Sequence, residues 1–187
     1  MNKRQSIPFI ILLVAFLTWL YLKPQKELPE TSKHQPSYIA YNVTNTHFDI
    51  AGRSDYKLYA DKVINFNATN KTLFENPRVI IYARKTDDNV PSIWQLSSKK
   101  GVLYNQDTLT LNDDVWLKNL SLDQLVQTMH TQELTILLDK KEVTSDLFVN
   151  WTGPQMKQQG VGLWGSLESE EFVVKDKIET VYLNEKN

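Results

Sequence analysis

The stretch 103–117, LYNQDTLTLNDDVWL, decides the fold. Leucine and threonine alternate at 108–111, which is the two-residue period of a strand that buries one face. The polar residues 105–107 predict a turn before this strand, and 112–114 predict a bend within it. Val115 and Leu117 then resume the alternation. The stretch therefore predicts an antiparallel hairpin whose second strand is irregular.

The same period recurs on both sides of this hairpin. Tyr56, Leu58 and Ala60 alternate with polar residues, and the segment 172–183 is predicted as a last hairpin that turns at 175–177. Further apolar runs lie at 63–66, 79–82, 93–96, 134–138 and 143–151, with polar turns at 67–72, 86–91 and 139–142 between them. Antiparallel hairpins at such short intervals favour an all-β sandwich, roll or open barrel.

An uncharged segment, IPFIILLVAFLTWLYL at 7–22, precedes the predicted strands. With its neighbours it reaches about 18 residues, near the lower limit for a helix that spans a membrane. A cleaved signal peptide is the alternative, because Lys3 and Arg4 precede the apolar run. Bulky residues stand where a signal peptidase requires small ones, so we expect residues 1–23 to be a short cytoplasmic tail and a retained anchor. The bulk of the chain is then expected outside the cytoplasm.

Residues 24–37 contain three prolines and alternating charges, which predicts a solvated tether. The remaining segment, 38–187, is long enough for one domain with its own core. The net charge of −1 and the absence of a basic cluster argue against a nucleic-acid partner. The chain has no cysteine, which excludes disulfides, thiolate catalysis and thiolate metal sites.

The segment 160–165, GVGLWG, matches the glycine pattern of dinucleotide-binding proteins. That fingerprint requires a strand before it and a helix after it, whereas the sequence that follows here alternates like strands. We therefore expect these glycines to serve tight turns and close backbone approach.

No arrangement of polar residues predicts catalysis or a cofactor. The three histidines, His34, His47 and His130, form no metal-binding pair in sequence. An acidic cluster near the C-terminus is predicted to be a solvated charged surface, although a membrane-tethered envelope enzyme acting on glycans would use such carboxylates. The cluster consists of Glu168, Glu170, Glu171 and Asp176.

The order of these features resembles the LptC family, the bitopic inner-membrane component of the lipopolysaccharide export machinery. The resemblance covers the whole chain and rests on the single anchor, on YKLYA at 56–60, on Asn76-Pro77 and on the stretch 109–117. The segment VTSD at 143–146, followed by Gly153, also fits. The resemblance implies a twisted open β-jellyroll in the periplasm and no enzymatic activity.

The resemblance further implies that the protein receives lipopolysaccharide from an inner-membrane ABC transporter and passes it to a soluble periplasmic bridge protein. Strand parity predicts a lipid-facing trough of Phe74, Ile80, Leu111, Val115, Leu117 and Ile136. The transporter permease subunits are expected at an N-terminal edge with Tyr41, Val43 and Phe48, and the bridge protein at a C-terminal edge with Phe172, Val174, Ile178 and Tyr182. A structural anchor that regulates the transporter without binding lipid is the alternative.

Overall fold

A computed structural model describes residues 13, 16, 18, 35–84, 90–121 and 126–183. Contacts between Cα atoms divide the chain into residues 1–32 and 33–187. Of the predicted tail and anchor, only Leu13, Phe16 and Thr18 are described; they are helical and exposed, and the rest of the prediction lies outside the described residues. Within the described residues no helix has both the length and the apolar character needed to cross a membrane.

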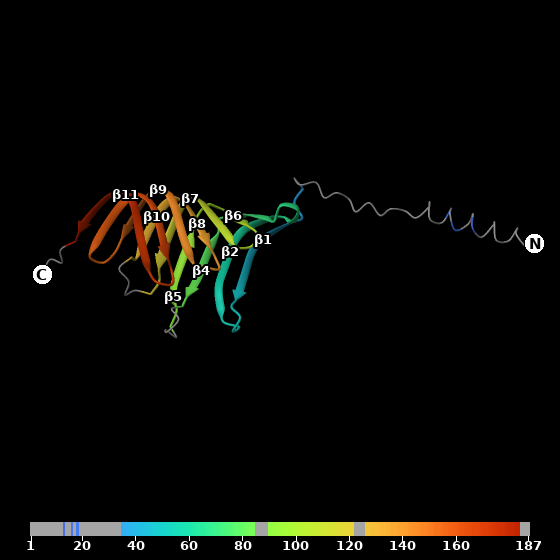
Figure 1. The fold of residues 1–187 in the computed structure, drawn as a ribbon, viewed down its shortest axis with the longest axis horizontal. Helices are drawn as coiled ribbons and strands as arrows, with labels where there is room; N and C mark the ends of the chain where they lie inside the picture. The colour runs from blue at the N-terminus through green and yellow to red at the C-terminus, as the bar shows by residue number, and fades with distance from the viewer. Residues whose placement is uncertain are drawn as a thin grey trace, which may run out of the picture. The chain divides into compact units, whose positions relative to one another are not determined.

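Residues 38–182 form eleven strands whose pairings are all antiparallel, so the all-β prediction is confirmed (Figure 1). The strands are β1 (Tyr38–Phe48), β2 (Ser54–Phe66), β3 (Lys71–Glu75), β4 (Arg78–Ala83), β5 (Ser92–Ser97), β6 (Lys100–Tyr104), β7 (Thr108–Asn119), β8 (Thr128–Leu137), β9 (Glu142–Thr152), β10 (Met156–Ser166) and β11 (Glu171–Tyr182). One turn of 3-10 helix, Asn67–Thr69, precedes β3.

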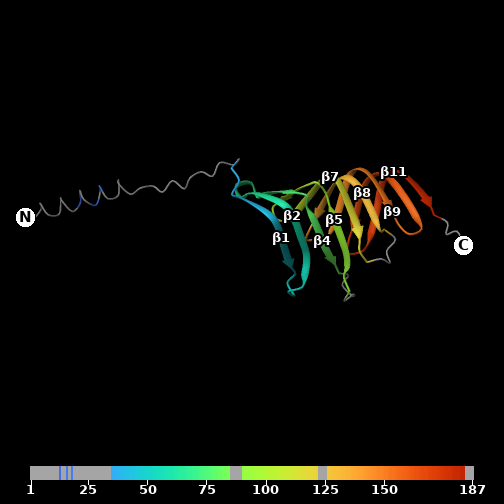
Figure 2. The same ribbon diagram turned by 180° about the vertical axis from the view of Figure 1, so that it is seen from behind.

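Two long strands, β2 and β7, organise the sheet. One part of β2 pairs with β4 and another part with β3, while β7 likewise pairs with β5 and with β6. Because β4 also pairs with β5 and β3 with β6, these six strands form a closed ring of ladders. Strands β8 to β11 continue from β7, and β1 pairs with the other side of β2. The terminal strands β1 and β11 lie at opposite ends of this domain (Figures 1 and 2).

Apolar side chains from alternate strand positions meet inside this arrangement. The Phe172 ring of β11 lies 5.4 Å from the Trp94 ring of β5 and 6.1 Å from the Trp151 ring of β9, so β11 packs over strands that are distant in the sheet. The most deeply buried core residues include Trp94, Leu96, Leu109, Leu111, Leu134, Ile136 and Leu163. The sheet therefore rolls over so that two parts of it face each other as two layers. Burying these side chains is the main favourable term that holds the two layers together.

The predicted turn and bend in the stretch 103–117 are both confirmed. Strand β6 ends at Tyr104 and β7 begins at Thr108, with Asn105 and Gln106 at positive φ between them. The register of β7 against β8 shifts between Asn112 and Val115, where Asp113 and Asp114 have φ of 64° and 60°. This bulge keeps Val115 and Leu117 directed into the core.

The predicted last hairpin is wrong, because β11 is one continuous strand. Its irregularity is a bulge near Lys177, which has φ of 50°, while the partner register shifts between Gln159 and Val161. The segment 160–165 lies in β10, which the sequence did not predict as a strand. A Cβ on Gly160 would lie 2.5 Å from Val174 and 2.7 Å from the carbonyl oxygen of Asp176, so this glycine does permit the expected close approach.

Candidate functional site

The apolar interior opens at the β1 end of the domain into a cavity of about 380 Å³. Strands β1, β2, β3 and β6 are hydrogen-bonded neighbours that supply most of the lining, and residues of the turns that follow β6 and β8 complete it. The apolar part of the lining consists of Val43, Tyr56, Leu58, Val63, Phe74, Leu103 and Leu138. The polar part consists of Asn45, His47, Asn65, Thr72 and Gln106, and Tyr38 stands among them.

The predicted trough residues fall into three places. Phe74 lines the cavity at the β1 end. The others that face inward, Leu111, Val115, Leu117 and Ile136, are at most 2% exposed and lie in the packed core beyond it. Ile80 is a correction: it pairs with Lys57 and Gln95, and its neighbours Val79 and Ile81 take the buried positions. The strand begins at Arg78, so the parity chosen for β4 was one residue out of step.

Sequence reasoning missed several residues that line the cavity. Leu103 stands near the end of β6, where the alternation is too short to assign a face, and Leu138 lies just past the end of β8. Val63 follows a polar pair that interrupts the alternation in β2. Val63 and Phe74 are direct cross-strand partners, which places both in the same wall. The pairing of β2 with β3 across the turn 67–70 was the signal that could have found Val63.

Polar groups surround the mouth of the cavity. The His47 ring stacks on the Tyr56 ring at 4.8 Å, and His47 Nδ1 lies 3.5 Å from an oxygen of Asp55. Burial raises the pKa of Tyr56, and the Asp55 carboxylate raises it further. The buried Oδ1 of Asn65 accepts no hydrogen bond. A polar ligand group at this position would satisfy it.

A largely buried ion pair beside the mouth joins β2 to the turn between β8 and β9. Lys141 Nζ lies 2.9 Å from Asp55 Oδ1, and these side chains are only 12% and 14% exposed. Asp55 belongs to β2, whereas Lys141 stands in the turn between β8 and β9. Glu168, in the turn after β10, lies 4.0 Å from the same ammonium group. The pair therefore fastens strands that no ladder connects.

The acidic cluster is spread over structural contacts. Glu168 approaches Lys141, and Glu170 accepts a hydrogen bond from the Ser92 hydroxyl. Asp176 accepts a hydrogen bond from the backbone N–H of Lys177 at the β11 bulge. Within residues 35–84, 90–121 and 126–183, no group of three histidine or acidic side chains could hold a metal ion.

Both terminal strands carry exposed apolar side chains. In β1, Tyr41 and Phe48 are 68% and 56% exposed, while Val43 is half-buried in the cavity wall. In β11, Ile178 and Tyr182 are exposed together with Val173 and Val181, whereas Phe172 packs on the core and Val174 is buried. The predicted edge residues thus divide into outward positions and core positions. Each strand pairs on one side only among the described strands.

The sequence profile of a family described as "Lipopolysaccharide-assembly, LptC-related" matches residues 9–183. The chain belongs to this LptC family. A Haemophilus influenzae relative, "Lipopolysaccharide export system protein LptC", is 26% identical over 97% of this chain and 95% of its own length. The Escherichia coli K12 protein of the same name is 23% identical with the same coverage. The predicted resemblance is confirmed. Members of this family are components of lipopolysaccharide transport, and the family is not known as an enzyme family.

A solved structure shares the fold. It is that of LptH from Pseudomonas aeruginosa, described as "the LptA homologous periplasmic component of the conserved lipopolysaccharide transport device". The TM-score is 0.53 at 8% identity, over 67% of this chain and 93% of LptH. This similarity supports the predicted β-jellyroll for the domain of the present LptC family member.

Proposed function

We propose that this protein is a non-enzymatic carrier that receives lipopolysaccharide from an inner-membrane ABC transporter and passes it to a soluble periplasmic β-jellyroll protein. The observation that carries the proposal is an apolar interior that opens beside a terminal strand. Acyl chains would gain the free energy of apolar burial inside the roll while the saccharide stays in water. The names of the relatives support lipopolysaccharide as the cargo.

The proposal places residues 1–23 as cytoplasmic tail and single membrane anchor, 24–37 as tether and 38–187 as the periplasmic domain. The uncharged segment 7–22 and the family match from residue 9 onward support this division. Tethering confines the domain to the membrane surface, which raises its effective concentration at a transporter.

Acyl chains would enter through the cavity at Phe74 and Leu103 and then reach Leu111, Val115, Leu117 and Ile136. These deeper side chains belong to one cluster of buried residues and are at most 2% exposed. Loading therefore requires the two layers to separate, and the Lys141–Asp55 pair lies where that separation would begin. Ile80 has no part in this path.

The exposed sides of β1 and β11 would each add a strand of a neighbouring protein. Tyr41 and Phe48 mark the side that would meet the transporter permease subunits, and Ile178 and Tyr182 the side that would meet the bridge protein. Main-chain hydrogen bonds would supply affinity at both places. A continuous sheet would then extend the apolar interior from one protein to the next.

Photocrosslinking tests the carrier role. A photoreactive residue replaces Leu103 or Leu117, with the neighbouring Val102 and Lys118 as controls on the opposite faces of the same strands. In membranes that contain the transporter and lipopolysaccharide, we expect ATP-dependent lipid adducts at 103 and 117 and none at 102 and 118. Equal adducts on both faces would contradict the proposal.

The packed state of the interior favours a second candidate, a scaffold that regulates the transporter through its anchor and β1. Leu109, Leu111, Leu134 and Ile136 have no exposed surface. A folded protein that stimulates or restrains the transporter ATPase but gives no adduct at any inward position would establish this function instead.

A further inference from the structure

The pairing along one side of β2 has a gap at Ala60 and Asp61. On one side, β2 pairs with β4 as far as Tyr59 and with β3 from Lys62 onward. The two residues between these ladders therefore face the corner at Asn76, where β3 ends and the chain turns into β4. On the other side, the pairing with β1 passes over Asn42, which has φ of 51°.

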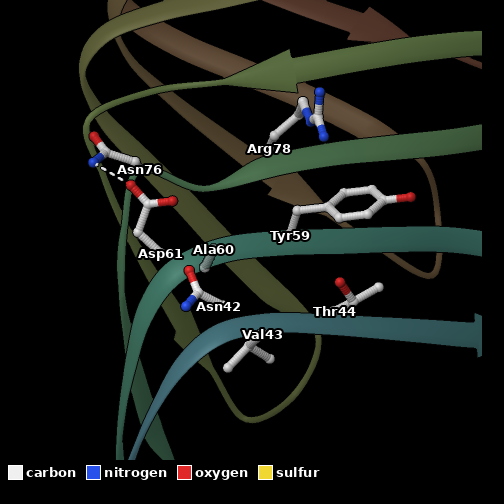
Figure 3. A pocket seen from close by; sticks show the side chains of 8 residues that line it. All are labelled: Asn42, Val43, Thr44, Tyr59, Ala60, Asp61, Asn76 and Arg78. Carbon is white, nitrogen blue, oxygen red and sulfur yellow. Dashed lines mark hydrogen bonds between the residues drawn. The ribbon is translucent and has the colours of Figure 1, made fainter.

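A cavity of about 410 Å³, which we call the outer cavity, lies at this gap (Figure 3). Its lining is Asn42, Val43, Thr44, Tyr59, Ala60, Asp61, Asn76 and Arg78. Most of these side chains belong to the outward face of the sheet, because their neighbours Leu58 and Val79 are buried on the inward face. Val43 also lines the cavity at the β1 end, so one side chain borders both spaces.

The outer cavity holds a carboxylate and a guanidinium that lack opposite charges. Asp61 Oδ2 accepts a hydrogen bond of 2.8 Å from Asn76 Nδ2, and within the described part of the chain no cation pairs with it. Arg78 lies with its Cζ 4.8 Å from the centre of the Tyr59 ring and forms no ion pair with any described carboxylate. Figure 3 shows Arg78 beside Tyr59 and the Asn76–Asp61 pair at the corner.

The backbone at this place is held in an unusual conformation. Asn42 and Asn76, which stand on either side of Asp61, both have left-handed φ angles of 51° and 49°. Asparagine tolerates this region better than most residues, although the conformation still costs free energy. Two amide groups therefore border the carboxylate, one from β1 and one from the corner between β3 and β4. Backbone strain of this kind occurs at ligand sites as well as at turns and bulges.

These groups match a sugar that bears phosphate. A guanidinium donates two parallel hydrogen bonds to phosphate oxygens, and contact with an aromatic ring leaves its edge free to do so. A carboxylate accepts hydrogen bonds from hydroxyl groups, while asparagine amides both donate and accept them. We propose that the outer cavity binds a phosphorylated saccharide, the head of an amphiphile whose chains lie in the cavity across Val43. This inference rests on the proposed carrier function for the position of the chains.

Binding of a lipid-free probe to the full-length protein in detergent tests the outer cavity directly. The probe is deacylated lipopolysaccharide that retains its phosphates, titrated by calorimetry. Arg78→Gln and Asp61→Asn each remove one charge from the cavity, and we expect each to weaken binding by about tenfold or more. Arg53→Gln is the matched control, because Arg53 pairs with Asp49 in the β1–β2 loop. Unchanged affinity in both cavity variants would overturn the proposal.

A second arm identifies the part of the ligand that each residue contacts. Enzymatic removal of phosphate from the probe should weaken wild-type binding and abolish the difference between wild type and Arg78→Gln, while Asp61→Asn should still be weaker. Arg78→Lys keeps the positive charge but lacks the planar guanidinium, so its affinity for the phosphorylated probe should lie between those of the wild type and Arg78→Gln. A phosphate-independent effect of Arg78→Gln would contradict the assignment.

Two controls separate the cavity from the carrier role and from soluble sugar phosphates. In one outcome, Arg78→Gln loses affinity for the saccharide, and the wild type gives no lipid adduct at 103. This outcome would uphold saccharide binding in the outer cavity and reject the carrier function. In the opposite outcome, the wild type gives the adduct at 103 and all variants bind the probe equally. This outcome would uphold the carrier function and reject saccharide binding in the outer cavity. Glucose 1-phosphate that binds as tightly as the saccharide would reject the link to an amphiphile.

Discussion

The packed centre of the domain and its open end are built from the same alternating pattern. In the centre, defined by the buried residues of β7 and β8, Leu109, Leu111, Leu134 and Ile136 have no exposed surface. At the open end, defined by the cavity lining of about 380 Å³, Val43, Tyr56 and Leu103 remain partly exposed. Alternation fixes which face of a strand is apolar, but the presence of a facing strand decides whether that face is packed.

The difference follows from where strands are available to face one another. The centre has β7 and β8 within the ladders and β11 folded over β5 through Phe172. At the open end, the lining that β1, β2, β3 and β6 supply is completed by turns, at Gln106 and Leu138. Half-covered apolar side chains adjacent to a terminal strand are the reason for our proposal that a ligand or a partner binds at this end.

Truncating leucine in the two regions should have the largest effect and separates them most clearly. Leu134→Ala in the centre should lower the free energy of unfolding by about 2–5 kcal/mol, because a close-packed site keeps a void. Leu103→Ala at the open end should cost about 1 kcal/mol, because its side chain is only partly removed from water. Urea unfolding of the full chain in detergent, followed by tryptophan fluorescence, measures both. Equal losses would mean that the open end is packed in solution.

Removing one member of the Lys141–Asp55 pair should have the next largest effect. Lys141→Met leaves a mostly buried Asp55 carboxylate without its cation, and we expect a loss of about 1–3 kcal/mol. Asp55→Asn should cost a similar amount. The double variant should be more stable than the sum of the single losses predicts, because neither charge is then left unpaired. Additive losses would show that the Lys141 and Asp55 side chains do not stabilise each other.

The same variants connect stability to loading. If separation of the layers admits the lipid, Lys141→Met should increase the crosslinking yield at 117 relative to the yield at 103. A fall in both yields would show that the pair holds the mouth in a shape that loading requires.

Polar residues and alternation within the stretch 103–117 were sufficient to predict the turn at Asn105, a bend at Asp113, which the structure shows to be a bulge, and the inward position of Leu117. These features depend on local residue chemistry: asparagine and aspartate accept positive φ, and apolar side chains at every second position share one face. Strand β4 shows the limit of this reasoning. With six residues and apolar side chains at Val79, Ile80 and Ile81, its sequence permits either parity, and the pairing with β2 decides.

The candidate site was predictable only in part for a related reason. Phe74 was identified although the adjacent Leu73 permits the opposite parity, whereas Leu103 and Leu138 line the cavity from strand ends. Strand β10 was missed because its glycines lower the strand propensity of 160–165, although Gly160 is required there for the approach of β11. Which surfaces meet across the roll depends on pairing between residues far apart in the chain, and a single sequence does not encode this as a local signal.

The smallest expected effect concerns pH and the outer face of the packed centre. Asp114 Oδ1 lies 2.9 Å from His130 Nε2 and accepts a 3.1 Å hydrogen bond from Trp116 Nε1. The hydrogen bond with His130 lowers the pKa of Asp114, and the bond from Trp116 lowers it further. A carboxyl whose pKa is lower in the folded state contributes stability above its unfolded pKa and loses it as the pH falls through the folded value.

Asp114→Asn should therefore remove part of the acid sensitivity of the centre. Between pH of about 5 and about 3, the free energy of unfolding should fall more steeply in wild type than in the variant. His130→Gln should give an intermediate slope, because Trp116 still donates to Asp114. Urea titrations at a series of pH values measure these slopes, and the lipid adduct at 103 provides the comparison with the open end. Because Asp114 stands on the outward face of β7, the adduct yield at neutral pH should be the same in both variants and wild type. A changed yield would mean that the bulge in the centre and the cavity at the open end move together, and the two regions could not be treated as independent.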